Sequence, residues 1–224
     1  MTQSDWTAVD RYLTDLLVGS DPALEATLEA NAAAGLPPYD VSPNQGKLLH
    51  VLARGQGARR ILEIGTLGGY STIWLARALP PDGRLITLEV DPGYAEVARA
   101  NLARAGLSEV AEVRVGPALE TLPQIAAGGE GPFDVIFIDA DKANNPQYLA
   151  WSLALSRRGS LIVVDNVVRN GAVIDADSND LVVRGARRGL ELLAAEPRVS
   201  ATAIQTVGSK GWDGFAIAVV IRDS

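Results

Sequence analysis

The sequence predicts an α/β fold: a mostly parallel sheet with helices on both faces and a helical extension at the N-terminus. From Arg59 onward, short apolar runs alternate with helix-length segments, which is typical of parallel strands joined by helices. The runs are rich in Val, Ile, Leu and Phe without regular alternation, as expected for strands buried on both faces. The first 55 residues instead carry apolar side chains at helical spacing.

Three helices are predicted in the extension, residues 1–57. The first repeats apolar side chains at the spacing of one helix face: Val9, Tyr12, Leu13, Leu16 and Leu17. Asp21-Pro22 and Ser42-Pro43 each place a capping residue before a proline at the first helical position, so two further helices begin there. The segment 35–40 interrupts the pattern between them. These helices precede the first strand, so they are placed to cap a site or to dock on a partner.

Seven strands are predicted in the core, residues 58–224. They are Ile61–Ile64, Leu85–Leu88, Val110–Val115, Phe133–Ile138, Leu161–Val164, Val199–Thr206 and Phe215–Ile221. The last two lack a helix-length gap, so we expect them to pair antiparallel at one side of the sheet. A helix begins at Asp91-Pro92 and ends before Gly106. No linker divides the sequence, which predicts a single domain over residues 1–224.

Composition excludes several classes of protein. The formal net charge of −7 argues against a nucleic-acid partner or an anionic membrane surface. The absence of cysteine excludes disulfides, thiolate metal sites and cysteine nucleophiles, and the single His50 excludes a multi-histidine metal site. Because there is no signal-like segment and no run of 18 apolar residues, we expect a cytoplasmic protein.

A glycine-rich turn and an acidic residue indicate a nucleoside site. The first strand runs into Glu63-Ile-Gly65-Thr-Leu-Gly68-Gly69-Tyr70-Ser71, where glycines let backbone N–H groups approach a ligand. Such a turn also occurs as a plain strand-to-helix connection, and it is not the G-x-G-x-x-G fingerprint. Glu89 ends the second strand about 20 residues further on, where such folds place an acid for ribose hydroxyls. The pair favours an adenosine-type ligand and leaves NAD open.

Acidic residues also end two later strands. Asp139-Ala-Asp141-Lys142 follows the fourth strand, and Asp165-Asn166 follows the fifth. If those strands are neighbours, Asp139, Asp165 and Asn166 converge on one point, and such oxygen donors suit Mg²⁺ or a similar ion. Each aspartate alone fits a cap or a turn equally well. Lys142, ordinarily a surface residue type, would act as a general base if desolvated beside a cation.

Taken in order, these motifs resemble the metal-dependent class I O-methyltransferases, of which catechol and caffeoyl-CoA O-methyltransferases are the best known. The resemblance runs from about Ser42 to Gly171 and implies a Rossmann-like class I methyltransferase fold. Its motifs are Leu62-Glu63-Ile64-Gly65, Gly69-Tyr70-Ser71, Thr87-Leu-Glu89-Val-Asp91, Gly116-Pro-Ala-Leu119, Phe133-Asp134, Asp139-Ala-Asp141-Lys142 and Asp165-Asn166.

The resemblance implies S-adenosylmethionine (SAM) as cofactor. The turn from Gly65 to Gly69 would pass under its methionine part, Ser71 would meet the amino-acid end, Glu89 the ribose, and Ala118 the adenine through its backbone. The implied cofactor-binding set is Glu63, Gly65, Thr66, Gly69, Ser71, Glu89, Ala118 and Asp139. The implied metal ligands are Asp139, Asp165 and Asn166, holding Mg²⁺ or another divalent cation such as Mn²⁺ or Ca²⁺. Lys142 is implied as the catalytic base, and a homodimer as the assembly.

The expected acceptor is a catechol-type or other phenolic small molecule. The stretch from Gly208 to Gly214 is longer than the family's turn, so Trp212 either walls the acceptor site or packs under its own loop. We expect Tyr39, Trp74 and Trp151 to be packing residues and His50 to be structural. We interpret the basic group Arg184, Arg187 and Arg188 as a solvated helix face, which favours a free phenol over a CoA thioester.

Three other functions compete with this one. A metal-independent methyltransferase would act on a nitrogen, carboxylate or other acceptor. An NAD-dependent oxidoreductase would use the glycine turn and Glu89 but leave Asp139, Asp165 and Asn166 without a purpose. A non-catalytic nucleoside-binding regulator would not need Lys142.

Overall fold

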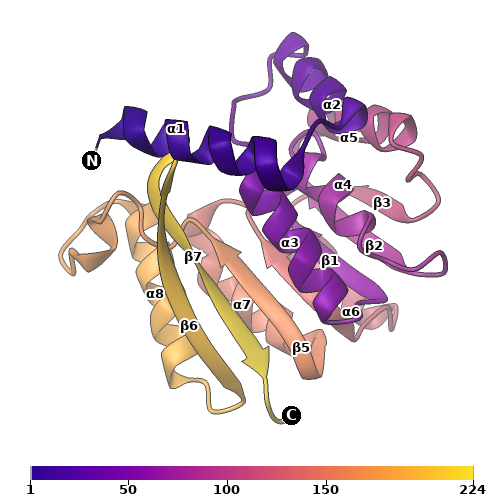
Figure 1. Ribbon diagram of the computed structural model, residues 1–224. Coiled ribbons are helices and arrows are strands. Elements are labelled where there is room, and N and C mark those ends of the chain that lie inside the picture. Colours follow the sequence, from indigo (N-terminus) through magenta and orange to yellow (C-terminus); the bar gives the residue numbers. More distant parts are fainter. Residues whose placement is uncertain (1, 224) are drawn as a thin grey trace.

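The computed structural model describes residues 2–223 and confirms the predicted α/β fold (Figure 1). One seven-stranded sheet has the order β3-β2-β1-β4-β5-β7-β6. β1 to β5 are parallel, and β7 runs antiparallel to both β5 and β6. The strands are β1 (Arg60–Ile64), β2 (Arg84–Glu89), β3 (Ala111–Val115), β4 (Phe133–Ile138), β5 (Ser156–Asp165), β6 (Val199–Gly208) and β7 (Gly211–Val220).

Helices cover both faces of the sheet because successive strand residues point to opposite sides. Ile61 joins the core on one face, under α3, α4 and α5, whereas Leu62 joins the core on the other, under α6, α7 and α8. In Figure 1 α3 lies in front of the sheet, with α7 and α8 behind it. These helices are α3 (Pro43–Gly55), α4 (Tyr70–Ala76), α5 (Pro92–Arg104), α6 (Ala118–Ala127), α7 (Asn145–Ala154) and α8 (Leu181–Ala195), with short 3-10 turns η2 (Lys142–Asn144) and η3 (Ala172–Ile174).

The N-terminal extension forms the predicted helices and shares the core. α2 (Pro22–Ala33) and α3 begin at the predicted caps, Asp21 and Ser42. Leu24 and Leu49 belong to the same buried cluster as strand residue Ile61, so the extension and the sheet pack around one core. α1 (Gln3–Leu13) continues into a π-helical turn, η1 (Thr14–Val18), and these two elements bury none of their residues. No helix within residues 2–223 is long and apolar enough to cross a bilayer.

The β6–β7 hairpin is longer than predicted. β6 extends to Gly208, two residues past the predicted end, and most of its side chains are exposed. α1 crosses the tip of this hairpin (Figure 1) and holds it by side chains. Gln3 Nε2 donates to the Gly208 carbonyl at 2.8 Å, and the Ser209 N–H donates to Asp10 Oδ2 at 2.7 Å. The tip is thereby fixed above the carboxyl ends of the neighbouring strands.

Candidate active site

A cavity of about 1020 Å³ lies at the carboxyl ends of β1, β2, β4 and β5. This is where an open α/β sheet is expected to bind ligands. Its walls come from the loops that follow these strands, from the segment between α2 and α3, and from the β6–β7 tip. Of the predicted site residues, Gly65, Thr66, Ser71, Glu89, Ala118, Asp139, Lys142, Asp165 and Asn166 line this one cavity.

The glycine turn is held against the ends of β2 and β4. Gly65 has φ +103°, and a Cβ there would lie 2.7 Å from the Asp139 carbonyl oxygen, so only glycine lets the turn approach β4 so closely. Leu67 adopts φ +51°, which is uncommon outside glycine. Its N–H donates to Glu89 Oε2 at 2.7 Å, and the Asp91 N–H donates to Oε1 at 2.9 Å. The Glu89 carboxylate is therefore fixed in the cavity wall, with acceptor capacity left for a ligand hydroxyl.

A buried hydroxyl network lies beneath the turn. Glu63 is fully buried and accepts hydrogen bonds from Ser71 Oγ (2.7 Å), Thr72 Oγ1 (2.5 Å) and Thr87 Oγ1 (2.7 Å). Thr87 also bonds Thr66 Oγ1 at 2.6 Å. Burial raises the pKa of Glu63 to about 7, although the three hydroxyls favour its charged form. Glu63 thus stands behind the cavity wall and orients Ser71, which does line it.

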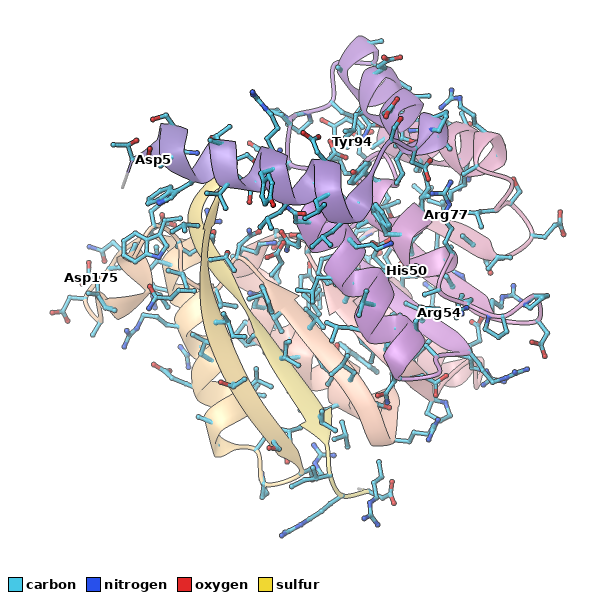
Figure 2. All side chains as sticks on the ribbon, in the orientation of Figure 1. Asp5, His50, Arg54, Arg77, Tyr94 and Asp175 are labelled. Carbon is cyan, nitrogen blue, oxygen red and sulfur yellow. The ribbon has the colours of Figure 1, made fainter. Side chains whose placement is uncertain are left out.

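The side of the cavity toward β2 and β3 is less polar. Ala118 begins α6 and lies beside Pro117 and Leu119 in the wall, and Tyr94 of α5 adds an aromatic ring. Tyr94 is labelled among the helices at the upper right of Figure 2. Gly69 caps α4 with φ +85° and lies outside the lining, so its predicted contact with a cofactor finds no support in the cavity wall.

The polar side chains predicted to meet at the ends of β4 and β5 do so, and Asp139, Asp165, Asn166 and Lys142 form what we call the acidic corner of the cavity. Lys142 Nζ lies 2.6 Å from Asp139 Oδ1, and both residues are largely buried. Asp165 is 5% exposed and accepts hydrogen bonds from Gln45 Nε2 (2.7 Å) and the Asn166 N–H (2.8 Å). Burial, and then the negative charge of Asp139, raise the pKa of Asp165 to about 7. Two carboxylates therefore share a buried corner with a single lysine.

This donor set fits a divalent cation. Two carboxylates and the amide of Asn166 offer hard oxygen ligands, and the unfavourable proximity of Asp139 and Asp165 is relieved by positive charge between them. Asn166 lines the cavity with a backbone φ of +55°, a conformation that asparagine tolerates better than most residues. No group of three or more His, Cys, Asp or Glu residues within residues 2–223 is arranged to hold a metal, so the amide is needed to complete the set.

Asp141, to which the sequence assigned no role, organises the turn after β4. Its carboxylate accepts hydrogen bonds from Tyr148 Oη at 2.5 Å and from Asn144 Nδ2 at 2.6 Å. The Asn144 N–H also donates to the Asp141 carbonyl at 3.2 Å. These bonds tie the η2 turn to α7, and the turn carries Lys142.

The roof of the cavity is formed by the segment between α2 and α3 and by the β6–β7 tip, and its aromatic residues differ in part from prediction. Trp212 lines the cavity while its indole packs over Gly171, in the loop after β5, and donates to Gln205 Oε1 at 3.1 Å. Its role in walling the acceptor site stays a prediction. Tyr39 was expected to pack, and that prediction is wrong: it is 76% exposed and lines the cavity. The reason is that the Pro-Pro-Tyr segment crosses the cavity mouth rather than the core. Trp74 is buried, as predicted.

Two further predictions concern helices away from the corner. His50 lies in α3, and its Nδ1 is 3.1 Å from the Trp74 carbonyl oxygen, which supports a structural role. Arg184 and Arg188 of α8 are exposed, as expected of a solvated face. Arg187 departs from that prediction, because it is only partly exposed and donates to the Val173 carbonyl at 2.6 Å.

Sequence reasoning missed several wall residues. Gln45 contacts Asp165 from α3, and Asp40, Lys210 and Asp213 line the roof. Asp213 Oδ1 accepts from the Val168 and Arg169 N–H groups, both at 3.0 Å, and so joins the hairpin to the loop after β5. The signal available for Gln45 was its place three residues after the cap Ser42. Nothing local indicated its partner, which is 120 residues away.

The sheet order, with a cavity at the carboxyl ends of its parallel strands, defines a Rossmann-like fold of the class I methyltransferase type. A model of the O-methyltransferase family matches residues 18–217, and the chain belongs to that family.

Relatives and solved structures agree. A catechol O-methyltransferase from Mycobacterium tuberculosis is 58% identical over 212 residues, which are 95% of this chain and 94% of that protein. The O-methyltransferase from Bacillus cereus in complex with SAH has a TM-score of 0.97 at 60% identity, covering 98% of this chain and 100% of that one. An O-methyltransferase from Streptomyces achromogenes involved in tomaymycin synthesis, in complex with SAM, has a TM-score of 0.96 at 53% identity, covering 99% of both chains. The chain is a SAM-dependent O-methyltransferase.

Proposed function

We propose that this enzyme transfers the methyl group of SAM to a hydroxyl of a catechol-type or other phenolic small molecule, with a divalent cation at the acidic corner and Lys142 as general base. The observation that carries the proposal is the meeting of Asp139, Asp165, Asn166 and Lys142 in the wall of one cavity with Glu89 and the glycine turn. The relative named catechol O-methyltransferase supports the acceptor class.

The proposed cofactor contacts follow the wall. Glu89, with both carboxylate oxygens fixed by backbone N–H groups, would accept from ribose hydroxyls. Ser71 and the backbone of Gly65 and Thr66 would meet the methionine part, with Glu63 orienting Ser71 from behind. Ala118 would contact the adenine through its backbone at the less polar side.

The chemistry at the corner follows from the charges present. Asp139, Asp165 and Asn166 would hold a divalent cation such as Mg²⁺, which would supply Lewis-acid chemistry that makes an ortho-diol hydroxyl more acidic. Lys142 Nζ, in its neutral amine form, would accept the hydroxyl proton, and Asp139 Oδ1, 2.6 Å away, would accept a hydrogen bond from the ammonium that results. SAM supplies the electrophilic methyl group. In methyl transfer the oxyanion attacks the sulfonium methyl carbon, an O–C bond forms as the C–S bond breaks, and the sulfur leaves as a neutral thioether. Because the two charges cancel, a cavity that excludes water and aligns the two partners favours this step.

A screen of acceptors by product mass tests this function. The purified enzyme is incubated with SAM and with catechols, single phenols, amines and carboxylates, in Mg²⁺ or in excess chelator. We expect methylated ortho-diols that require Mg²⁺. The Asp139→Ala variant should lose the metal-dependent turnover, whereas Asp175→Ala, which removes an exposed carboxylate outside the cavity wall (Figure 2), should retain it.

Lys142 and the metal are tested separately. Lys142→Ala should lower kcat by about 10²–10⁴-fold while SAH still binds, because a positioned general base contributes about that much. Unchanged turnover in chelator would refute the metal role. A methylated amine or carboxylate as the main product would replace the phenolic acceptor by another class.

We also propose that the enzyme is a homodimer. Several large apolar side chains of α1, η1 and α3 are exposed, namely Val9, Tyr12, Leu16, Leu17 and Val51. The β6–β7 hairpin adds Ile204 and Val207, and β6 is an exposed ten-residue edge strand. Long exposed edges and large apolar patches are usually covered, and a second copy of the chain is the proposed cover.

A further inference from the structure

Helix α8 lies with its backbone directly against the turn that carries Lys142. A Cβ placed on Gly185 would lie 2.0 Å from the Lys142 carbonyl oxygen and 2.7 Å from Ala143 Cα. The shorter distance is about 1.4 Å below ordinary van der Waals contact, and the obstructing atoms are backbone that cannot turn aside. Glycine is therefore the one residue that lets α8 and η2 approach to the observed distance.

The turn is held from its other side as well. The Asp141 carboxylate binds Tyr148 Oη and Asn144 Nδ2, which fixes η2 to α7. Lys142 follows the end of β4 by only four residues, and its ammonium reaches back to Asp139 at 2.6 Å. The position of Nζ thus depends on where this short turn is held between α7 and α8.

Helix α8 has little freedom to retreat from an added methyl group. Its buried face includes Val183, Ala186 and Leu193, and Arg187 Nη1 donates to the Val173 carbonyl next to the loop that carries Asp175 (Figure 2). Gly189, one turn after Gly185, is different. A Cβ there would meet Leu149 Cδ1 at 3.3 Å and Asn145 Cβ at 3.4 Å, which a small adjustment accommodates.

We propose that Gly185 is a positioning residue for Lys142: by lacking a side chain it lets α8 hold the η2 turn at the depth that places Nζ against Asp139 and the acceptor. The inference rests on the proposed role of Lys142. It adds that this role depends on a residue that is neither charged nor in the cavity wall, 43 positions further along the chain.

Alanine substitutions at the two glycines test the inference. Gly185→Ala should lower kcat by about 10²-fold, because a displacement of about 1 Å at a reacting group costs about that much. The acceptor KM and the calorimetric Kd for SAH should stay within about two-fold of wild type. Gly189→Ala, the same change on the same helix, should leave kcat unchanged. In a Lys142→Ala background, Gly185→Ala should cause no further loss, since the group it positions is gone.

Each other outcome is decisive. A wild-type kcat in the Gly185→Ala variant would overturn the proposal. If Gly185→Ala lowered kcat as much in the Lys142→Ala background as in the wild type, Gly185 would act elsewhere, and the proposal would also be overturned. A wild-type kcat in the Lys142→Ala variant would overturn both the role of Lys142 as base and the role of Gly185 in positioning it. If only the Gly185→Ala variant lacks the expected loss of kcat, the positioning role is overturned and the proposed function stands. If Gly185→Ala does not fold, Arg187→Met loosens α8 without adding volume. It should lower kcat several-fold with SAH affinity unchanged, and an unchanged kcat counts against the proposal.

Discussion

Glu63 shows how a single residue can link stability to the proposed cofactor site. It is fully buried, three hydroxyls donate to it, and one of them, Ser71, faces the cavity. Burial raises its pKa from 4.5 to about 7. The folded state therefore retains a proton that the unfolded chain releases between about pH 4.5 and pH 7. Stability from this group is fully present below pH 4.5 and is lost as the pH rises through 7.

The pH dependence of unfolding in Glu63→Gln tests this link. Glutamine is neutral at every pH, so wild type should lose stability relative to the variant by ~3 kcal/mol between pH 4.5 and pH 8. Urea unfolding in chelator gives the free energy of unfolding of both proteins at each pH. Because Asp165 is present in both, its contribution cancels in the difference. A difference that stays constant over this range would mean that Glu63 titrates at its ordinary pKa in the fold.

The site residues that could be predicted from sequence are those at strand ends. Asp139, Asp165 and Glu89 follow recognisable apolar runs, and parallel strands bring such ends to one edge. Gln45 and Tyr39 could not be found this way, because their contacts join segments far apart in the chain. The contact of Gly185 with the η2 turn could not be predicted either, because a single glycine in a helix does not indicate which backbone packs against it.

At the scale of elements, α1, η1 and the β6–β7 hairpin carry eight exposed large apolar side chains. The sequence predicted α1 and the hairpin, because the apolar spacing of α1 and the two adjacent strand runs are local patterns. It left open whether α1 caps a site or docks on a partner, since spacing alone does not say what a helix packs against. The additional length of β6 and the π-helical turn η1 also depend on tertiary contacts.

The assembly can be tested on this surface. Leu16 lies 63% exposed in η1, and Leu16→Glu would place a charge in the proposed interface. We expect its dimer Kd to rise by about 30-fold or more, the effect of losing a central interface side chain. Leu181→Glu makes the same change at the start of α8, behind the sheet, and should remain dimeric. Sedimentation velocity across a concentration series measures the monomer–dimer equilibrium of wild type and of both variants. A monomeric wild type, or a Leu16→Glu variant as dimeric as wild type, contradicts the proposal.

For the whole molecule, the sheet gathers charge at one edge. Asp40, Glu89, Asp139, Asp141, Asp165 and Asp213 line the cavity against Lys142, Arg169 and Lys210. This excess of negative charge suits a sulfonium cofactor and a metal cation together. The fold class followed from the alternation of apolar runs and helix-length segments in the sequence. The strand order and the roof of the cavity did not, because they depend on segments that only the complete fold brings together.

Locating a metal ion beside the cofactor is the most direct test of the proposed mechanism. In a crystal grown with Mn²⁺ and SAH, the anomalous difference map should show one peak at bonding distance, about 2.0–2.2 Å, from oxygens of Asp139, Asp165 and Asn166. SAH should occupy the same cavity, with its ribose on Glu89. A map with SAH bound but no peak between these three side chains would contradict the account.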